Sequence, residues 1–339
     1  MSGTLAVVSQ SCSSISFFDL QSSERTAYLT DLIPEPHEIL FDSKRNVMYC
    51  SHAYHHGHFW SHGDNGHQIS VIDPNKKEVV DIIETRPALG PHGLVLDAKQ
   101  DILWCSYEEH ESSSSGGVIG IDPNTRKVIK QVESSTKTHW FVVTPDGKKA
   151  FTCNKTAPFI SVLDLENQRM IGKIESPGGT EECSISLDGK YAYFPTPGTQ
   201  FGKIPESPQV LVIDTAMDKI VARIALQSGA LSTYVAGDGK ILVGEYRYVN
   251  GLAAKGQLSV YDSKTNKLVG ATDIGKMPLT LRASPDGKLG FTANIFEGSV
   301  SVVDMSTMEV TKTLVVDTER SKVSNICQGA HGMVYFPRD

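Results

Sequence analysis

Short runs of alternating hydrophobic and polar residues recur along the whole chain, and each run ends in an aspartate. The seven copies are Ile15–Asp19, Ile69–Asp73, Val118–Asp122, Ile160–Asp164, Val210–Asp214, Leu258–Asp262 and Val300–Asp304. Alternation with a period of two is typical of a β-strand with one buried face. The aspartates lie about 48 residues apart on average, and self-similarity at such a period indicates a repeat architecture.

Each copy is followed by a polar turn and a second β-like run, such as Lys127–Glu133. A third run, a turn such as Pro145–Lys148 and a fourth run such as Ala150–Asn154 complete the repeat. The Asp-Gly pair in that turn supplies the positive φ that a tight hairpin needs. Four short strands per repeat describe one propeller blade, and no window sustains helical periodicity. We predict an all-β, seven-bladed β-propeller, four antiparallel strands per blade, as a single domain over residues 1–339.

The two ends of the chain are expected to share the first blade. Thr4–Ser9, Ile15–Leu20 and Arg25–Thr30 match the second, third and fourth strands of a blade, so the innermost strand is missing. We predict that His331–Phe336 supplies it. Such a splice closes the ring and removes an exposed sheet edge.

The repeat pattern V-x-V-x-D, followed by P-D-G-K and a run ending near Thr-x-Asn, resembles the YVTN-type propellers over essentially the whole chain. The motifs are best in the blades around Asp164 and Asp304. The chain does not resemble a WD40 protein, since none of Trp60, Trp104 and Trp140 is followed by aspartate. The resemblance implies a scaffold, and the function has to be argued from the site.

The innermost strands place polar side chains at one end of the predicted channel. Going round the ring, the first positions of these strands are His331, His37, His92, His139, Glu181, Leu231 and Leu279. A long segment, His52–His67, contributes six further histidines, and His110 lies in the loop after Tyr107. All eleven histidines therefore fall on one predicted face, and the long segment is a candidate lid.

Four roles compete for the histidine column: proton transfer, a site for Fe, Zn or Mn, hydrogen bonding to a ligand, or strand packing alone. Imidazoles with a pKa near 6.5 exchange protons at neutral pH, and a carboxylate tunes them. We favour proton transfer, with His139 and Glu181 as the acid/base pair. The predicted catalytic residues are His37, His92, His139, Glu181 and His331. We expect no cofactor, and a metal on the histidine column is the less favoured alternative.

The opposite side of the ring is predicted to be apolar, because Leu231 and Leu279 stand in the column there. A polar wall facing an apolar one suits a small, partly apolar organic substrate. The predicted substrate-binding residues are His52, Tyr54, Phe59, Trp60, Tyr107, Phe201, Tyr246, Arg247, Tyr248, Asn294 and Phe296.

Composition narrows the partners and the location. The net charge is −7 and no block of Lys and Arg is present, which argues against nucleic acid. No apolar run approaches the roughly 18–20 residues of a membrane span, and the first residues lack the pattern of a signal peptide. The six cysteines form no C-x-x-C pair and are expected to be reduced. We predict a cytoplasmic protein without a membrane partner and leave the oligomeric state open.

Two groups of YVTN-like propeller enzymes resemble this pattern. One comprises the lactonase and muconate-cyclising propellers, which place His, Glu and Arg around the channel. The other comprises fungal propellers of natural-product pathways, including proposed hetero-Diels–Alderases that join a tropolone-derived quinone methide to a humulene-type alkene. The aromatic-rich segment His52–His67 is closer to the second group, which implies a cofactor-independent cyclase. A lactonase, a metal-dependent lyase and a non-catalytic protein- or peptide-binding propeller are the alternatives.

Overall fold

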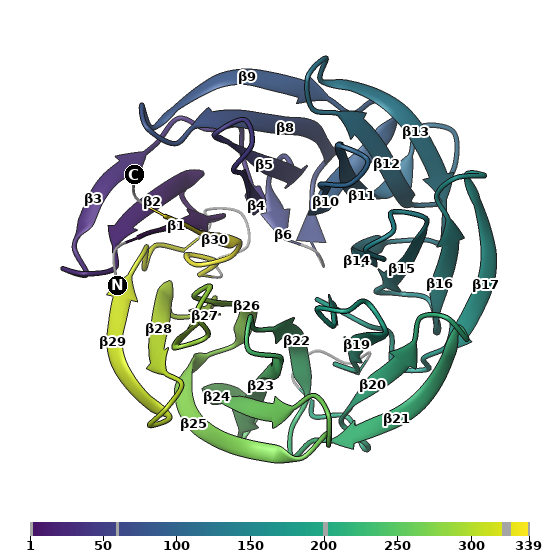
Figure 1. Cartoon of the computed structure of the whole chain (residues 1–339). Coiled ribbons are helices and arrows are strands. Elements are labelled where there is room, and N and C mark those ends of the chain that lie inside the picture. The colour runs from purple at the N-terminus through teal and green to yellow at the C-terminus, as the bar shows by residue number, and fades with distance from the viewer. Residues whose placement is uncertain (1–2, 59–60, 199–202, 321–326, 338–339) are drawn as a thin grey trace.

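The computed structural model describes residues 3–58, 61–198, 203–320 and 327–337. Its strands form seven four-stranded antiparallel sheets arranged in a ring, with a short two-stranded sheet on one of them (Figure 1). The prediction of a seven-bladed, all-β propeller is confirmed. Among the described residues no helix is long and apolar enough to cross a membrane.

Each blade consists of four strands, and its innermost strand faces the centre of the ring (Figure 1). From the innermost strand outward, the first blade contains β30 (Met333–Phe336), β1 (Thr4–Ser9), β2 (Ser14–Asp19) and β3 (Arg25–Leu29). The next two contain β4 (Pro36–Asp42), β5 (Val47–Tyr54), β8 (Asn65–Asp73) and β9 (Glu78–Glu84), then β10 (Ala88–Asp97), β11 (Ile102–His110), β12 (Gly117–Asp122) and β13 (Lys127–Glu133). The fourth and fifth contain β14 (Thr138–Val143), β15 (Lys149–Asn154), β16 (Phe159–Asp164) and β17 (Arg169–Glu175), then β18 (Ser184–Ile185), β19 (Tyr191–Pro195), β20 (Gln209–Asp214) and β21 (Lys219–Ala225). The last two contain β22 (Ala230–Val235), β23 (Lys240–Val249), β24 (Leu252–Asp262) and β25 (Leu268–Lys276), then β26 (Pro278–Ala283), β27 (Leu289–Asn294), β28 (Ser299–Asp304) and β29 (Glu309–Val315).

The repeated aspartate shapes the turn between the third and fourth strands of every blade. At Asp304, for example, Oδ1 accepts hydrogen bonds from the amides of Ser306 at 2.8 Å and Thr307 at 3.2 Å. The same two bonds recur at the other six aspartates. The fourth residue after each aspartate has a φ between 53° and 65°; these residues are Ser23, Lys77, Arg126, Gln168, Asp218, Asn266 and Met308. The sequence repeat is therefore a repeat of turn chemistry.

Ser23 offers a direct test of this turn. Its φ of 65° lies in the left-handed region, which costs an L-residue about 1–2 kcal/mol, whereas glycine loses only about 0.5–1 kcal/mol of chain entropy. Ser23→Gly is expected to raise the free energy of unfolding by up to about 1 kcal/mol in urea denaturation. Ser22→Gly, one residue away and without a positive φ, is the control and should lower it. A fall in stability for Ser23→Gly would contradict the strain argument.

The C-terminal strand closes the ring. Strand β30 pairs antiparallel with β1, with Leu5 opposite Tyr335 and Val7 opposite Met333. His331 precedes the strand, but its amide still donates to the Val8 carbonyl at 2.9 Å. Leu5, Val7 and Met333 belong to one hydrophobic cluster with side chains of β27 and β28, so the first blade packs on the last. The predicted splice is confirmed.

The segment 52–67 differs from the loop that the sequence suggested. The pairing of β5 with β8 continues along both strands as far as Tyr54 and Asn65. Further along the same segment, β6 (Gly57–His58) pairs with β7 (Ser61–His62). Between them, the amide of His55 donates to the Asp64 carbonyl and that of Gly63 to the His56 carbonyl. Backbone hydrogen bonds thus extend the blade into a hairpin, which we call the histidine hairpin. Phe59 and Trp60 lie outside the described residues.

Candidate functional site

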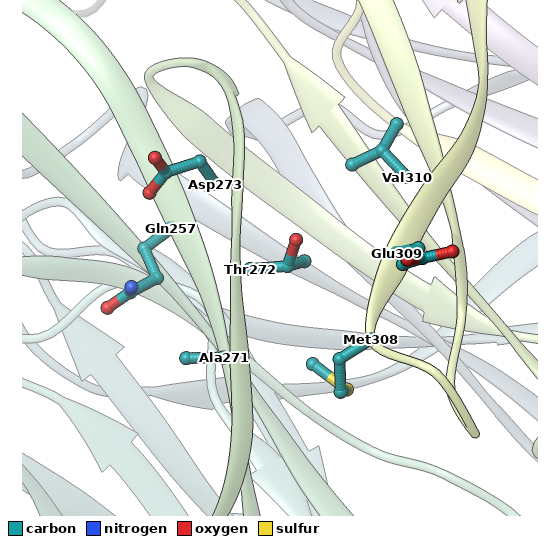
Figure 2. Close-up of a pocket in the computed structure, with 7 residues that line it drawn as sticks. All are labelled: Gln257, Ala271, Thr272, Asp273, Met308, Glu309 and Val310. Atoms are coloured by element: carbon teal, nitrogen blue, oxygen red, sulfur yellow. The ribbon is translucent and has the colours of Figure 1, made fainter.

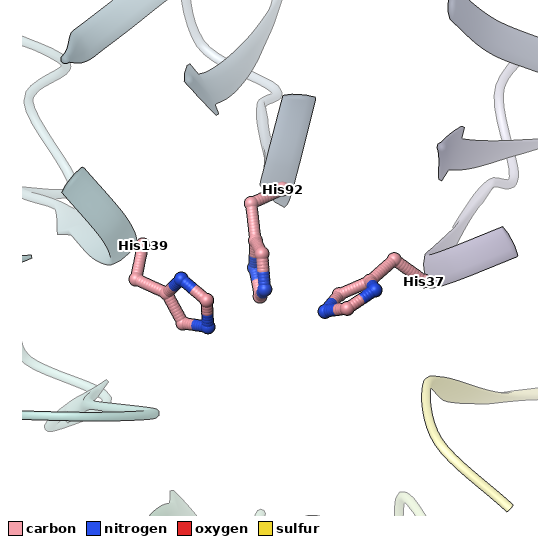
Figure 3. Close-up of side chains that lie close together, drawn as sticks. All are labelled: His37, His92 and His139. Carbon is pink, nitrogen blue, oxygen red and sulfur yellow. The ribbon is translucent and has the colours of Figure 1, made fainter. Parts of the chain in front are cut away.

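The histidine column converges at the centre of the ring. His37 and His139 are the second residues of β4 and β14, whereas His92 lies further along β10, and Figure 3 shows their rings pointing into the same central space. The ring centroids of His37 and His92 are 4.1 Å apart, and those of His92 and His139 are 3.5 Å apart. His331 lies on the other side of His37, at 4.1 Å. With Glu181, which contacts His139, these four histidines form the central cluster.

The central cluster is buried, and some of its polar atoms have no partner. None of its five residues is more than 4 % exposed, and His92 is completely buried. Neither ring nitrogen of His92, nor Nδ1 of His37, has a hydrogen-bond partner among the described residues. An unpartnered polar group in the interior costs about 1–3 kcal/mol. This arrangement is expected of a place where a ligand supplies the missing interactions.

His139 is held in one orientation by Glu108, a residue of β11. Its Nδ1 lies 2.8 Å from Glu108 Oε1, which also accepts a hydrogen bond from the Tyr54 hydroxyl at 2.8 Å. Lys137 Nζ donates to Glu108 Oε2 at 2.9 Å. In a hydrogen bond to this carboxyl oxygen, Nδ1 of His139 is the donor, which places the lone pair of a neutral ring on Nε2. That nitrogen is left facing the centre of the cluster.

Glu181 adds a carboxyl group to the same centre. Its Oε1 accepts a hydrogen bond from Lys155 Nζ at 2.9 Å and lies 3.4 Å from His139 Nε2. Its Oε2 is buried without a partner among the described residues. Burial raises the pKa of Glu181, and Lys155 opposes that shift. The pairing of His139 with Glu181 that the sequence suggested is therefore present as a contact between neighbouring blades.

The histidines are less basic than the sequence suggested. Burial lowers the pKa of His37, His92 and His139 well below the usual value, and Lys155 and the proximity of other imidazoles lower it further. Burial also lowers the pKa of His331 to about 3. The expectation of imidazoles that titrate near neutral pH does not hold in this environment. The four rings are neutral at physiological pH, which suits them to accept a ligand on a lone pair.

A second layer of charge, which sequence reasoning missed, lies beside the central cluster. Arg282 Nη1 donates a hydrogen bond to Glu182 Oε1 at 2.7 Å. Glu38 Oε1 lies 3.1 Å from Nδ1 of His331, but these two atoms do not have the geometry of a hydrogen bond. Burial raises the pKa of Glu182 to about 8 and that of Glu38 well above its usual value, and the Arg282 guanidinium opposes only part of each shift. Both glutamates directly follow a residue of the histidine column in the chain. That position next to the column was the feature of the sequence by which they could have been predicted.

Glu182 gives a prediction for the pH dependence of stability. Its pKa of about 8 in the folded protein exceeds the value of about 4.3 for an unfolded chain. The folded state therefore binds this proton more tightly than the unfolded chain does. The resulting stabilisation of the folded state is complete below about pH 4.3 and is lost as the pH rises toward 8. Glu182→Gln, which mimics the protonated group, is expected to flatten the decline in urea midpoint between pH 5 and pH 8.

The decline should be reduced rather than abolished, because Glu38 still titrates beside the same arginine. Glu166→Gln removes one negative charge from an exposed turn and is the matched control. Parallel pH profiles for Glu182→Gln and the wild type would show that Glu182 is ionised in the folded protein throughout this range.

An apolar cluster occupies the side of the ring formed by β22, β23 and β26. Tyr246, Met277, Leu279 and Ile295 are buried in it, and Leu231, Tyr248 and Phe296 pack against it partly buried. Tyr246 is anchored because its hydroxyl donates to the Pro197 carbonyl at 2.6 Å. The structure thus brings together five of the residues predicted for the apolar wall.

The other predicted substrate-binding residues lie in different surroundings. Tyr54 packs edge-on against His37 beside the cluster. His52 is buried in its blade, with Nε2 2.8 Å from Ser70 Oγ, and Tyr107 belongs to the core between two blades. Asn294 donates to Ser301 Oγ at 2.9 Å inside the last blade, and Arg247 pairs with Asp273 at the surface at 2.8 Å. The predicted residue Phe201 lies outside the described residues, as Phe59 and Trp60 do.

A separate surface hollow lies on the outer part of the molecule. It runs along β25 and the start of β29 and is lined by Gln257, Ala271, Thr272, Asp273, Met308, Glu309 and Val310 (Figure 2). It is open to solvent and contains none of the residues predicted for the site.

Comparisons with known proteins agree with the fold. No family model matches the chain. It is 28% identical over 228 residues to the uncharacterized protein YncE of Salmonella typhi, which covers 66% of this chain and 57% of that protein. It is 25% identical over 190 residues to antigen Lp49 of Leptospira interrogans, covering 54% of this chain and 39% of that protein. The chain thus matches little more than half the length of the first of these relatives.

Solved structures extend the likeness at the level of the fold. A chain of hydrazine synthase from Kuenenia stuttgartiensis superposes with a TM-score of 0.67 at 18% identity, covering 90% of this chain and 88% of that one. A functionally unknown protein from Desulfotomaculum acetoxidans gives 0.73 at 12% identity, with full coverage of both chains. The match with YncE supports the resemblance to YVTN-type propellers. The narrower resemblance to fungal cyclases has no counterpart among these proteins.

Proposed function

We propose that the protein is a small-molecule enzyme whose reaction takes place at the central cluster. The observation that carries this proposal is His92, which is completely buried with both ring nitrogens unpartnered among the described residues. A propeller that only presents a surface to another protein gains nothing from such a group, which destabilises the fold by about 1–3 kcal/mol. A polar substrate atom at the centre would supply the missing partner.

The distribution of side chains around the channel supports a partly apolar organic substrate. Histidines and glutamates come from β4, β10, β14 and the residues before β18 and β30, whereas the column positions of β22 and β26 are Leu231 and Leu279. Such a ligand would place its oxygen atoms toward the central cluster and its hydrocarbon part toward the apolar cluster. Few, well-placed polar groups beside an apolar wall are typical of small-molecule sites.

Within this class we propose loss of water followed by ring closure, the hetero-Diels–Alder type of cyclisation implied by the resemblance to fungal propellers. Glu181 is the group assigned to proton transfer, because its carboxyl lies between Lys155 and His139. The apolar wall would hold the alkene against the reactive diene, and proximity of this kind contributes several kcal/mol to a bimolecular reaction.

The proposal is tested with defined substrates. A hydroxymethyl tropolone, which loses water to form a quinone methide, is incubated with humulene and the protein, and products are followed by chiral liquid chromatography with mass spectrometry. One stereoisomer of the adduct should form faster than with heat-denatured protein. A panel of lactones tested in parallel would identify a lactonase instead. Absence of catalysis with both substrate classes would favour the non-catalytic binding propeller.

A further inference from the structure

The arrangement of His37, His92 and His139 suggests more than a hydrogen-bonding site. Each residue offers one ring nitrogen, and these three nitrogens all lie within 4.8 Å of one another. The three side chains come from consecutive blades and point into the same space (Figure 3). We infer that these histidines bind a divalent transition metal at the centre of the propeller.

The chemical state of the ligands fits such a metal. A transition metal binds imidazole through a ring nitrogen, and His37, His92 and His139 each offer one such nitrogen to the same buried space. His92 has both nitrogens unpartnered among the described residues, so one is available to a metal without breaking a hydrogen bond. Bonds of about 2.0–2.1 Å place ligand nitrogens about 3.4 Å apart in a tetrahedral site. A bound metal would therefore draw the three nitrogens closer than the 4.8 Å within which they now lie.

Glu108 provides the outer support that metal-binding histidines usually have. A ligand histidine almost always donates its second N–H to a carboxylate or carbonyl, which fixes the tautomer and makes the other nitrogen more basic. His139 Nδ1 contacts Glu108 at 2.8 Å, and Tyr54 and Lys137 fix that carboxylate. The hydrogen bonding around Glu108 therefore orients Nε2 of His139 for a metal.

The ligand set narrows the kind of metal and its role. Three imidazoles favour Zn²⁺, Fe²⁺, Ni²⁺ or Cu²⁺ over Mg²⁺ or Ca²⁺, which prefer oxygen. Three protein ligands leave a position open for a substrate oxygen, as in catalytic rather than structural zinc sites. This inference deepens the proposed function, since a metal there would polarise that oxygen beside Glu181. Metal binding itself is measured without substrate, so it can fail or succeed independently of the proposed reaction.

Cobalt(II) is the probe, because its visible absorption reports the coordination geometry. The full-length protein, with any affinity tag removed, is dialysed against a chelator and titrated with Co²⁺. We expect about one equivalent to bind with the intense bands of four-coordinate cobalt, and added Zn²⁺ to displace it. His92→Gln should abolish the bands, and Glu108→Gln should weaken the affinity about 10–100-fold. Circular dichroism of each metal-free variant checks that it folds.

The histidine hairpin is the main competing site, so it supplies the matched control. His55 and His67 lie there with ring centroids 5.4 Å apart, and His56 is exposed. The double variant His55→Gln/His56→Gln should keep the cobalt bands. Loss of binding in this control with retention in His92→Gln would overturn the inference, as would less than half an equivalent bound by the wild type. If His92→Gln does not fold, Glu108→Gln provides the test. An unchanged affinity of Glu108→Gln for Co²⁺ would then reject the proposed metal site.

Discussion

Replacing Glu181 by glutamine is expected to lower kcat of the proposed cyclisation by about 10²–10⁴-fold, the range typical of a lost general acid or base. The amide retains the shape of the side chain and an oxygen that accepts from Lys155, so the interaction now 2.9 Å long can persist. It has no group that takes up and releases a proton. Because substrate contacts are preserved, KM should change little. The measurement is steady-state kinetics with the tropolone and humulene pair.

The control for this variant is Glu166→Gln, which changes the same functional group on the exposed turn between β16 and β17. Its kinetics should match those of the wild type. Melting temperatures of both variants establish that differences in kcat do not arise from unfolding. A reduction of kcat by less than threefold in Glu181→Gln would remove Glu181 from the proton-transfer role, even if turnover by the wild type had been demonstrated.

Replacing Met333 by alanine is expected to lower the free energy of unfolding by about 2–5 kcal/mol, the range for removing a large aliphatic side chain from a core. Met333 is completely buried and belongs to the cluster that joins the first blade to the last. The variant leaves a cavity where the two ends of the chain meet. Equilibrium urea denaturation gives the change directly.

Met217 provides a matched control, because it is 56 % exposed on a turn between β20 and β21. Met217→Ala should change stability by less than about 0.5 kcal/mol, as most surface substitutions do. If Met333→Ala were equally mild, the packing at the closure would contribute little, and backbone pairing of β30 with β1 would be the main fastening of the ring.

The fold was predictable because its determinants are local. The aspartate at the end of each third strand binds amides two and three residues later, so one short motif carries the whole turn. The third strand of a blade is buried along nearly its whole length, because both of its faces pack against neighbouring blades, as those of Phe159–Asp164 do. The histidine hairpin escaped prediction for the opposite reason. Its sequence has no alternation, and backbone pairing that continues from β5 and β8 determines its conformation.

The site was predictable only in part. Equivalent positions in a repeat face the same way, so the sequence placed His37, His92 and His139 together, with Leu231 and Leu279 across from them. The partners of these residues come from other blades. Glu108 contacts His139 across 31 positions of the chain, and Arg282 contacts Glu182 across 100. No local pattern links such residues, which is why the contacts of Glu108 with His139 and of Arg282 with Glu182 were missed.

The sequence by itself determined the number of blades, the closure of the ring and which side chains of the column meet at its centre, because periodicity and turn chemistry act over a few residues. Only the tertiary structure decided how those side chains behave. Burial at the centre of the ring removes water from the histidines, so their pKa falls and they stay neutral. It also leaves His92 without hydrogen-bond partners among the described residues. The solvation of these histidines and their hydrogen bonding depend on how several blades pack around one axis and exclude water. That packing cannot be read from the order of residues in the chain.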